Sequence, residues 1–452
     1  MSGTSESPRS QGIWDRARAV IPGGVNSGTR ANGAPLSLAD AEGAYVVDAD
    51  GRRYLDFHAA FGAILLGHRH PIVDDAVAAS RDGVDLVGYG VTETEVQLAE
   101  LLARTIPSIE QTLLVNTGSE AVAYALRIAR AHTDRRLIIK VQGGFHGWSD
   151  AVARNVISAP GREYGDDPIS AGILPEVLAA TLIAEWNDLD SIRRLFDEHP
   201  DQIAAVIVEP IPHNVGALLP TDGFLAGLRE LTSDRGALLI FDEVITGFRH
   251  ALGGYQSIAG ITPDLTTFGK AMGNGYATAG VGGPERVMRQ ADPAKGGDVS
   301  VMGTFNGNPV SCAASLATIG YLQEHPDFYD RTYAFGERMR SGLRQIFAET
   351  EVRATVAGHG GTFTIYFGID QALGYRDLVA LDRAASHAYL RGMIDRGHLL
   401  LPMAMKRNHV SGAFTEADIE GALAAARDTA ETLAAAGELP RTGSLAPTGQ
   451  TA

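Results

Sequence analysis

The chain has 452 residues, 45% of them hydrophobic, which suits a large globular protein with a sizeable core. Its formal charge is −16, from 38 basic and 54 acidic residues, and no basic run occurs. Nucleic acids and anionic membrane surfaces are therefore not expected partners, because both require clustered Lys and Arg. The sequence lacks both a stretch of roughly 20 apolar residues and an apolar signal core, so we expect a cytoplasmic protein.

The N-terminal section, residues 1–60, is predicted to contain a polar arm and part of a small domain. Within it, the stretch "AYVVDADGRRYLDF" (44–57) is typical of two short strands around an Asp-Gly turn. The single cysteine, Cys312, excludes a disulfide framework and a multi-cysteine metal site, so we expect a buried structural thiol and no metal.

Residues 61–325 are predicted to form a large α/β domain, because short apolar runs alternate with helical patterns. The expected strands include "TLLVN" (112–116), "RLIIKV" (136–141), "AAVIVEP" (204–210), "ALLIFDEV" (237–244) and "DLTTFGK" (264–270). Such continuous apolar runs indicate a mainly parallel sheet covered on both faces. In these sheets ligands bind at the carboxyl ends of the strands, so the polar residues that follow each run are the candidate site.

The C-terminal section is expected to complete the small α+β domain, so that both termini contribute to it. Residues 326–435 contain the strand pattern "TFTIYFGI" and the long helical pattern "EADIEGALAAARDTAETLAAA", and residues 436–452 are expected to be a flexible tail. The Gly- and Pro-containing segment 154–175 of the large domain is hypothesised to gate the site.

One lysine stands out at the end of a predicted strand. The chain has only four lysines, and Lys270 lies between Gly269 and Ala271 directly after an apolar run. A lysine can lose its proton when desolvated and condense with an aldehyde, whereas arginine cannot under ordinary conditions. A phosphate-binding ATPase loop is the rival interpretation, but it requires Ser or Thr after the lysine and a glycine where Asp264 stands.

The other strand ends carry groups that complement a reactive lysine. Gly118 and Ser119 begin a helix, whose free N–H groups could bind a phosphate, with Ser119 as a possible cap. Asp242 ends a buried strand, where a carboxylate needs a partner such as a pyridinium nitrogen. The aromatic Phe145 follows another strand and could stack on a ring. Together with Lys270, these residues suit an aldehyde cofactor that carries a phosphate and a pyridine nitrogen.

At these residues the chain resembles the class III pyridoxal-phosphate aminotransferases, and within them the glutamate-1-semialdehyde 2,1-aminomutase branch. The matching stretches are "IPGGVNS", "NTGSEA", "FHGWSD", "VEP", "FDEVITGFR", "TTFGKAMGNG" and "GTFNGNP", spread over roughly residues 12–435. The resemblance implies fold type I of the pyridoxal-phosphate enzymes, pyridoxal 5'-phosphate as cofactor, and a homodimer with shared active sites.

The resemblance also implies roles for single residues. Lys270 would bind the cofactor covalently and move the substrate proton, while Asp242 would pair with the pyridine nitrogen. The other expected cofactor contacts are Gly118, Ser119, Phe145, His146, Glu209, Asn214 near the phenolic oxygen, Val244 on the second ring face, and Thr304, which would reach the neighbouring subunit's phosphate.

The substrate residues depart from the aminomutase pattern. Arg30 stands where that branch places an arginine for the substrate carboxylate. In "PMAMKRNHVSGAFTEADI", Lys406, followed by Arg407, occupies the position of a glutamate that receives the second amino group of the aminomutase substrate. These two cations would either bind a second anionic group or lie at the surface. Further departures are "GNG" for "GGG" after Lys270, and Phe145 for a tyrosine.

These departures favour an aminotransferase that moves an amino group from an amino acid, with β- and D-amino acids among the candidates, to a keto or aldehyde acceptor by a ping-pong mechanism. The alternatives are glutamate-1-semialdehyde 2,1-aminomutase itself and a racemase or epimerase on the same fold. All three use small-molecule substrates.

Overall fold

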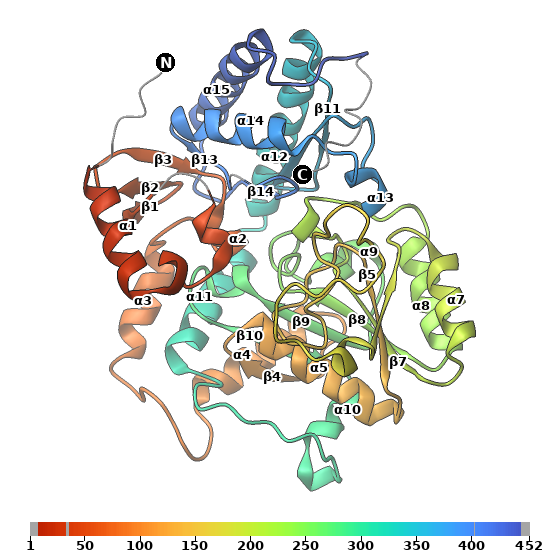
Figure 1. Ribbon diagram of the computed structural model, residues 1–452. Coiled ribbons are helices and arrows are strands. Elements are labelled where there is room, and N and C mark those ends of the chain that lie inside the picture. The colour runs from red at the N-terminus through yellow and green to blue at the C-terminus, as the bar shows by residue number, and fades with distance from the viewer. Residues whose placement is uncertain (1–7, 33–35, 402, 444–452) are drawn as a thin grey trace.

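The computed structural model describes residues 8–32, 36–401 and 403–443 (Figure 1). A seven-stranded sheet forms the centre of the large domain, in the order β4, β10, β9, β8, β7, β5, β6. Strand β10 runs antiparallel to both of its neighbours, and the remaining pairs are parallel. The strands are β4 (Gln111–Val115), β5 (Leu137–Val141), β6 (Thr181–Ala184), β7 (Ile203–Val208), β8 (Leu238–Glu243), β9 (Leu265–Gly269) and β10 (Ala279–Gly283). The mainly parallel sheet predicted from the sequence is confirmed.

Helices cover both faces of this sheet, which explains its continuous apolar strands. In β8, Leu239 and Phe241 pack in the same core cluster as helices α7 and α8, whereas Leu238 and Ile240 face helix α5. Every residue of β7, β8, β9 and β10 is buried. The helices of this domain are α2 (Ala59–Gly62), α3 (Pro71–Ser80), α4 (Glu93–Thr105), α5 (Gly118–Thr133), α6 (Pro175–Leu178), α7 (Leu189–Glu198), α8 (Phe224–Asp234), α9 (Tyr255–Ala259), α10 (Glu285–Met288) and α11 (Pro309–Glu324).

The small domain combines both ends of the chain, as Figure 1 shows by the red and blue segments that lie together. Strand β13 pairs in parallel with β3 of the N-terminal meander, and Phe57 packs in one cluster with Phe347 and Ile419. The elements are β1 (Leu38–Glu42), β2 (Tyr45–Asp48), β3 (Arg53–Asp56), β11 (Ala354–Ala357), β12 (Thr362–Phe367), β13 (His398–Leu399), β14 (Asn408–His409), α12 (Asp327–Glu349), α13 (Tyr375–Leu378), α14 (Arg383–Asp395) and α15 (Glu416–Ala435). The expected turn between β2 and β3 is present, with Gly51 at φ 86°.

The terminal segments differ from the expected flexible arm and tail. Residues Pro8–Val20 form helix α1, so only residues 1–7 of the arm lie outside the described residues. Residues 436–443 pack on the small domain, because Leu439 is buried and the Pro440 carbonyl accepts a bond of 2.7 Å from the Arg353 amide. The rest of the tail, residues 444–452, lies outside the described residues. None of the helices in the described ranges is both long and apolar enough to cross a membrane.

The segment 154–175 is attached to the large domain over much of its length. The buried Lys140 of β5 donates its Nζ to the carbonyl of Arg154. The Arg154 guanidinium in turn donates to the carbonyls of Leu178 (2.7 Å) and Gly165 (3.1 Å). The Ile169 amide bonds the Ala153 carbonyl at 3.0 Å. A gating movement of residues 154–169 would break all of these bonds, so the structure does not favour that part of the gating hypothesis.

Candidate active site

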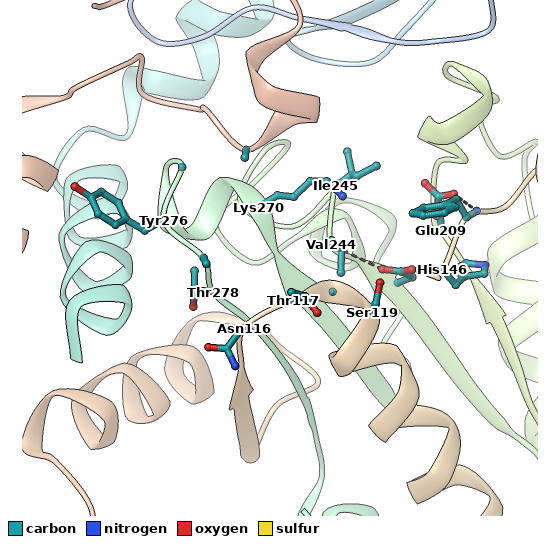
Figure 2. A pocket seen from close by; sticks show the side chains of 17 residues that line it. Asn116, Thr117, Ser119, His146, Glu209, Val244, Ile245, Lys270, Tyr276 and Thr278 are labelled. Atoms are coloured by element: carbon teal, nitrogen blue, oxygen red, sulfur yellow. Dashed lines mark hydrogen bonds and ion pairs between the residues drawn. The ribbon is translucent and has the colours of Figure 1, made fainter. Parts of the chain in front are cut away.

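A cavity of about 290 Å³ opens at the carboxyl ends of the parallel strands (Figure 2). It collects residues that follow five different strands, as the sequence predicts. Its lining is Ala63, Asn116, Thr117, Gly118, Ser119, Phe145, His146, Gly147, Glu209, Asp242, Val244, Ile245, Lys270, Gly275, Tyr276, Ala277 and Thr278. The structure therefore brings together seven of the predicted contacts with Lys270: Asp242, Gly118, Ser119, Phe145, His146, Glu209 and Val244.

Lys270 follows strand β9 directly and lies half-buried at the cavity. Its backbone has φ 45°, a left-handed conformation that non-glycine residues rarely adopt and that is common where backbone strain serves a site. No hydrogen bond or ion pair involves its Nζ within the described part of the chain. Burial, assisted by the positive charge of Arg407, lowers the pKa of Lys270 to about 8. Near-neutral pH thus leaves a substantial fraction of neutral, nucleophilic amine.

Asp242 is held by three donors at the end of β8. Its Oδ1 accepts bonds from the Thr267 hydroxyl (2.9 Å) and the Val244 amide (3.2 Å). Its Oδ2 lies 2.7 Å from Nδ1 of His146, which acts as the donor because a carboxylate only accepts. These contacts fix the carboxylate at the cavity wall, where it could accept a further bond from a cationic ring N–H. The Nε2 of His146 is buried without a hydrogen-bond partner among the described residues.

The N-terminus of helix α5 supplies an anion site. Thr117 is the N-cap and forms a capping box with Glu120, so the expected capping by Ser119 is wrong. Ser119 instead lies in the first turn, and its hydroxyl accepts a bond of 3.3 Å from the Trp148 amide. A Cβ added at Gly118 would lie 2.9 Å from Val244 Cγ1, so only glycine fits there. The first N–H groups of this helix have no intrahelical acceptor and favour a phosphate.

Glu209 lines the cavity and hydrogen-bonds two backbone segments, one after β5 and one after β7. Its Oε1 accepts a bond of 2.9 Å from the Phe145 amide, and its Oε2 one of 3.0 Å from the His213 amide. Burial raises the pKa of this carboxyl above its usual range. The bonds fix the backbone that carries Phe145, which follows β5. Phe145 lines the cavity together with Val244, which follows β8, so both side chains could flank a planar ring.

Lys406 and Arg407 are not surface residues, which removes one of the two interpretations of this pair. Lys406 Nζ donates to the side-chain oxygen (2.8 Å) and the carbonyl (2.9 Å) of Asn214. Arg407 is 6% exposed and donates to the Phe61 carbonyl at 2.6 Å and to Nε2 of His409 at 3.2 Å. Burial lowers the pKa of Lys406 to about 7 and that of Arg407 to about 10. Neither side chain lines the cavity.

Asn214, Arg30 and Thr304 also lie outside the cavity lining. Asn214 follows Glu209 in the loop after β7, and its Nδ2 is buried without a hydrogen-bond partner in the described ranges. Arg30, in the short helical turn η2 (Gly28–Ala31), and Thr304 are both exposed in this single chain. Their expected contacts with substrate and with a neighbouring subunit stay predictions.

Several lining residues were not predicted. Ala63 comes from the segment between β3 and α3, and Gly275, Tyr276 and Thr278 come from the turn after Lys270. The glycine-rich run "GNGYATAG" signals a backbone that lies close to a ligand or to another segment. The alanine at position 63 carries no comparable signal.

The residues together fit a phosphorylated pyridine aldehyde. An amine with a lowered pKa, an anchored carboxylate, an open helix N-terminus and two ring-flanking side chains all meet at one cavity. By contrast, Glu243, the neighbour of Asp242, turns to the other face and bonds Thr246 and Gln256 (2.8 and 3.0 Å). Its carboxylate therefore serves the packing of the fold.

Comparison with known proteins agrees with this geometry. The sequence model of the class III aminotransferases matches residues 28–386. Glutamate-1-semialdehyde 2,1-aminomutase 2 of Lachnoclostridium phytofermentans is 40% identical over 421 residues, which cover 92% of this chain and 97% of the relative.

Solved structures are similar over nearly the whole chain. An omega-transaminase from Sphaerobacter thermophilus has a TM-score of 0.87 and 35% identity, with 93% of this chain and 97% of that chain covered. A glutamate-1-semialdehyde aminomutase from Pseudomonas aeruginosa, in complex with PMP, has a TM-score of 0.82 and 27% identity, with 96% and 95% covered. The expected fold type I, with a large parallel-sheet domain and a small domain from both termini, is confirmed.

Proposed function

Because the chain belongs to the class III aminotransferase family, we propose that it is an aminotransferase that uses pyridoxal 5'-phosphate to move an amino group from an amino acid to a separate keto or aldehyde acceptor. The cofactor supplies an electron sink that stabilises a carbanion at the substrate Cα. The chain's own residues would then bind, orient and transfer protons around it.

Each residue has a defined task in this proposal. Lys270 provides the amine that holds the cofactor aldehyde and later carries the proton of the substrate Cα. Asp242, fixed by Thr267 and His146, accepts the ring N–H and keeps that nitrogen protonated. The helix N-terminus at Gly118 and Ser119 binds the phosphate.

The observation that favours the aminotransferase reaction over the aminomutase reaction is the charge around Lys406. The aminomutase branch has a glutamate there, which attracts the second ammonium group of a diamine. Here the buried Arg407, with a pKa of about 10, is a cation in that region, and Lys406, with a pKa of about 7, adds a partial positive charge at neutral pH. Like charges near 4 Å at an effective dielectric of about 20 repel by about 4 kcal/mol. A monoamine substrate avoids this repulsion.

Glutamate-1-semialdehyde 2,1-aminomutase is the second candidate, and the name of the relative at 40% identity supports it. A racemase or epimerase is the third, since it would need only return of the proton to Cα. All three share the cavity and Lys270, so they differ in products and not in cofactor chemistry.

The deciding experiment is a donor and acceptor panel with purified holoenzyme. We expect a donor among α-, β- and D-amino acids to bleach the visible band, and pyruvate or 2-oxoglutarate to restore it with release of a keto product. Competent conversion of glutamate 1-semialdehyde to 5-aminolevulinate without a second carbonyl compound would contradict transfer. Racemisation without a keto product would favour the third candidate.

We further propose a homodimer in which Thr304 reaches the phosphate site of the other subunit. Met302 and Phe305 flank Thr304 in the sequence. These two and three other large apolar side chains are exposed in this single chain, and a second copy would cover them. They are Tyr89 (98% exposed), Met302 (77%), Val91 (75%), Trp148 (71%) and Phe305 (58%).

Sedimentation velocity should therefore give a dimer. The double variant M302D/F305D should shift the equilibrium toward monomer and weaken pyridoxal-phosphate binding by about 10-fold, because a partner residue is lost from the site. A monomeric wild-type protein with full cofactor affinity would contradict the shared site.

A further inference from the structure

Part of the cavity lining belongs to a connector, residues 58–67, which leads from the small domain toward helix α3. The connector contributes Ala63 to the cavity. Its first part is the short element α2, whose backbone is a left-handed turn and not a regular α-helix: Ala59, Ala60 and Phe61 have φ values of 49°, 48° and 59°. Non-glycine residues avoid this conformation, so the surrounding structure must hold the connector in place.

Two buried arginines hold the left-handed turn. Arg249 donates to the carbonyls of Gly62 and Ile64, both at 2.9 Å, and Arg407 donates to the Phe61 carbonyl. Both guanidinium groups therefore bond the carbonyl groups of this turn.

Asn274 holds the second part of the connector. Its Oδ1 accepts bonds from the amides of Leu65 and Leu66, both at 2.9 Å, and its Nδ2 donates to the Gly67 carbonyl at 3.0 Å. The side chain is 6% exposed, so these backbone groups have no water to replace it.

Asn274 is also part of the turn that carries the reactive lysine. The short helical turn η4 (Lys270–Gly273) ends at Asn274, which has φ 43°. Asn tolerates this left-handed conformation better than most residues, and so it can replace a glycine here while adding three hydrogen bonds. The next residue, Gly275, lies so close to Ile64 that an added Cβ would be 2.9 Å from its Cδ1.

We infer that Asn274 is a positioning residue that fixes the Ala63 wall of the cavity relative to Lys270, and thereby limits the size of the substrate group between them. The asparagine of the "GNG" sequence after Lys270 thus links the turn that carries the lysine to the connector through three hydrogen bonds. The inference rests on the proposed use of this cavity as the reaction site, and it holds for a transferase and for a mutase.

The test is the variant N274G in the holoenzyme, since glycine keeps the left-handed backbone and removes only the three bonds. We expect backbone hydrogen exchange in a peptide spanning Leu65 and Leu66 to accelerate at least about 10-fold. The ratio of kcat/KM between a small and a large donor from the panel should change by roughly 10-fold, because the wall is no longer fixed.

The variant N274D separates the acceptor role of Asn274 from its donor role. It keeps an acceptor for the Leu65 and Leu66 amides but loses the donor to the Gly67 carbonyl. Its exchange rates and donor ratio should lie between those of wild type and N274G. The matched control is N187G. Asn187 also has a left-handed backbone (φ 62°) and donates to the carbonyls of Leu219 (3.0 Å) and Leu373 (2.8 Å), but it does not line the cavity.

The outcomes are distinct. N187G should lower the unfolding temperature but leave connector exchange and the donor ratio unchanged. Unchanged exchange in N274G would overturn the inference, whatever the substrate. Faster exchange with an unchanged donor ratio would also overturn it, because Asn274 would then be structural only. If the wild-type protein binds cofactor but no amine donor reacts, the proposed transfer reaction is wrong. Hydrogen exchange at Leu65 and Leu66 would still show whether Asn274 holds the connector.

Discussion

Lys270→Ala protein is expected to bind pyridoxal phosphate without a covalent link and to lose activity by roughly 10⁴-fold or more, because both the attachment and the proton carrier are removed. The readouts are the visible spectrum after gel filtration and the rate at which an amine donor bleaches that band. Lys270→Arg should be equally inactive, since it keeps the charge but cannot condense with an aldehyde. Lys295→Ala, at an exposed loop, is the control and should behave as wild type.

The assignment of Lys270 as the lysine that binds the cofactor can also be tested without knowing the substrate, by mapping the covalent attachment. The chain has only four lysines, so borohydride reduction of the holoenzyme followed by peptide mass spectrometry can locate the cofactor unambiguously. The peptide that contains Lys270 should carry it. A cofactor on Lys140, which is buried and also has a pKa lowered to about 7, would refute the assignment.

The surroundings of Lys270 also predict a pH dependence. A lysine with a pKa near 8 is neutral above that pH, so attachment of cofactor to apoprotein should accelerate as pH rises and level off above about 8. Compared with an ordinary pKa of 10.5, the neutral amine at pH 7 is roughly 300 times more abundant. Attachment that continues to accelerate up to pH 10 would contradict the effect of burial and Arg407.

Periodicity and turn chemistry predict much of this fold. The alternation of apolar runs with helical patterns gave the parallel sheet, because a strand buried on both faces must be apolar throughout. The residues at the ends of those runs gave Lys270, Asp242 and the aromatic Phe145, because parallel strands end at one edge. Glu209 was implied by the family resemblance. Residues 436–443 were expected to belong to a flexible tail because of the composition of residues 436–452, yet they pack on the small domain.

The rest of the site depends on long-range contacts that no local pattern records. Ala63 reaches the cavity only because Arg249, Arg407 and Asn274 hold the connector from three distant parts of the chain. The environment of Lys406 is similar, because its partner Asn214 is almost two hundred positions away in sequence. The sequence alone does not show whether a lysine or arginine is exposed or buried. The structure shows that Lys406 and Arg407 are not surface residues.

Asp242→Ala is expected to lower kcat/KM by roughly 10²- to 10⁴-fold while leaving the fold and the covalent attachment intact. The carboxylate keeps the ring nitrogen protonated, and without it the cofactor is a weaker electron sink. An N-methylated cofactor carries a permanent positive charge on that nitrogen. Reconstituting Asp242→Ala with it should restore part of the activity, whereas the same cofactor should not improve the wild type.

The adjacent carboxylate provides the matched control. Glu243 occupies the next position of β8 but faces Thr246, Gln256 and the Tyr255 amide away from the cavity. Glu243→Gln should reduce the free energy of unfolding by about 1–3 kcal/mol, because charge-assisted bonds to buried donors are weakened. It should not respond to the N-methylated cofactor. If Asp242→Ala binds that cofactor without any gain in rate, the carboxylate serves only to position His146 and Thr267, and its assigned electronic role is wrong.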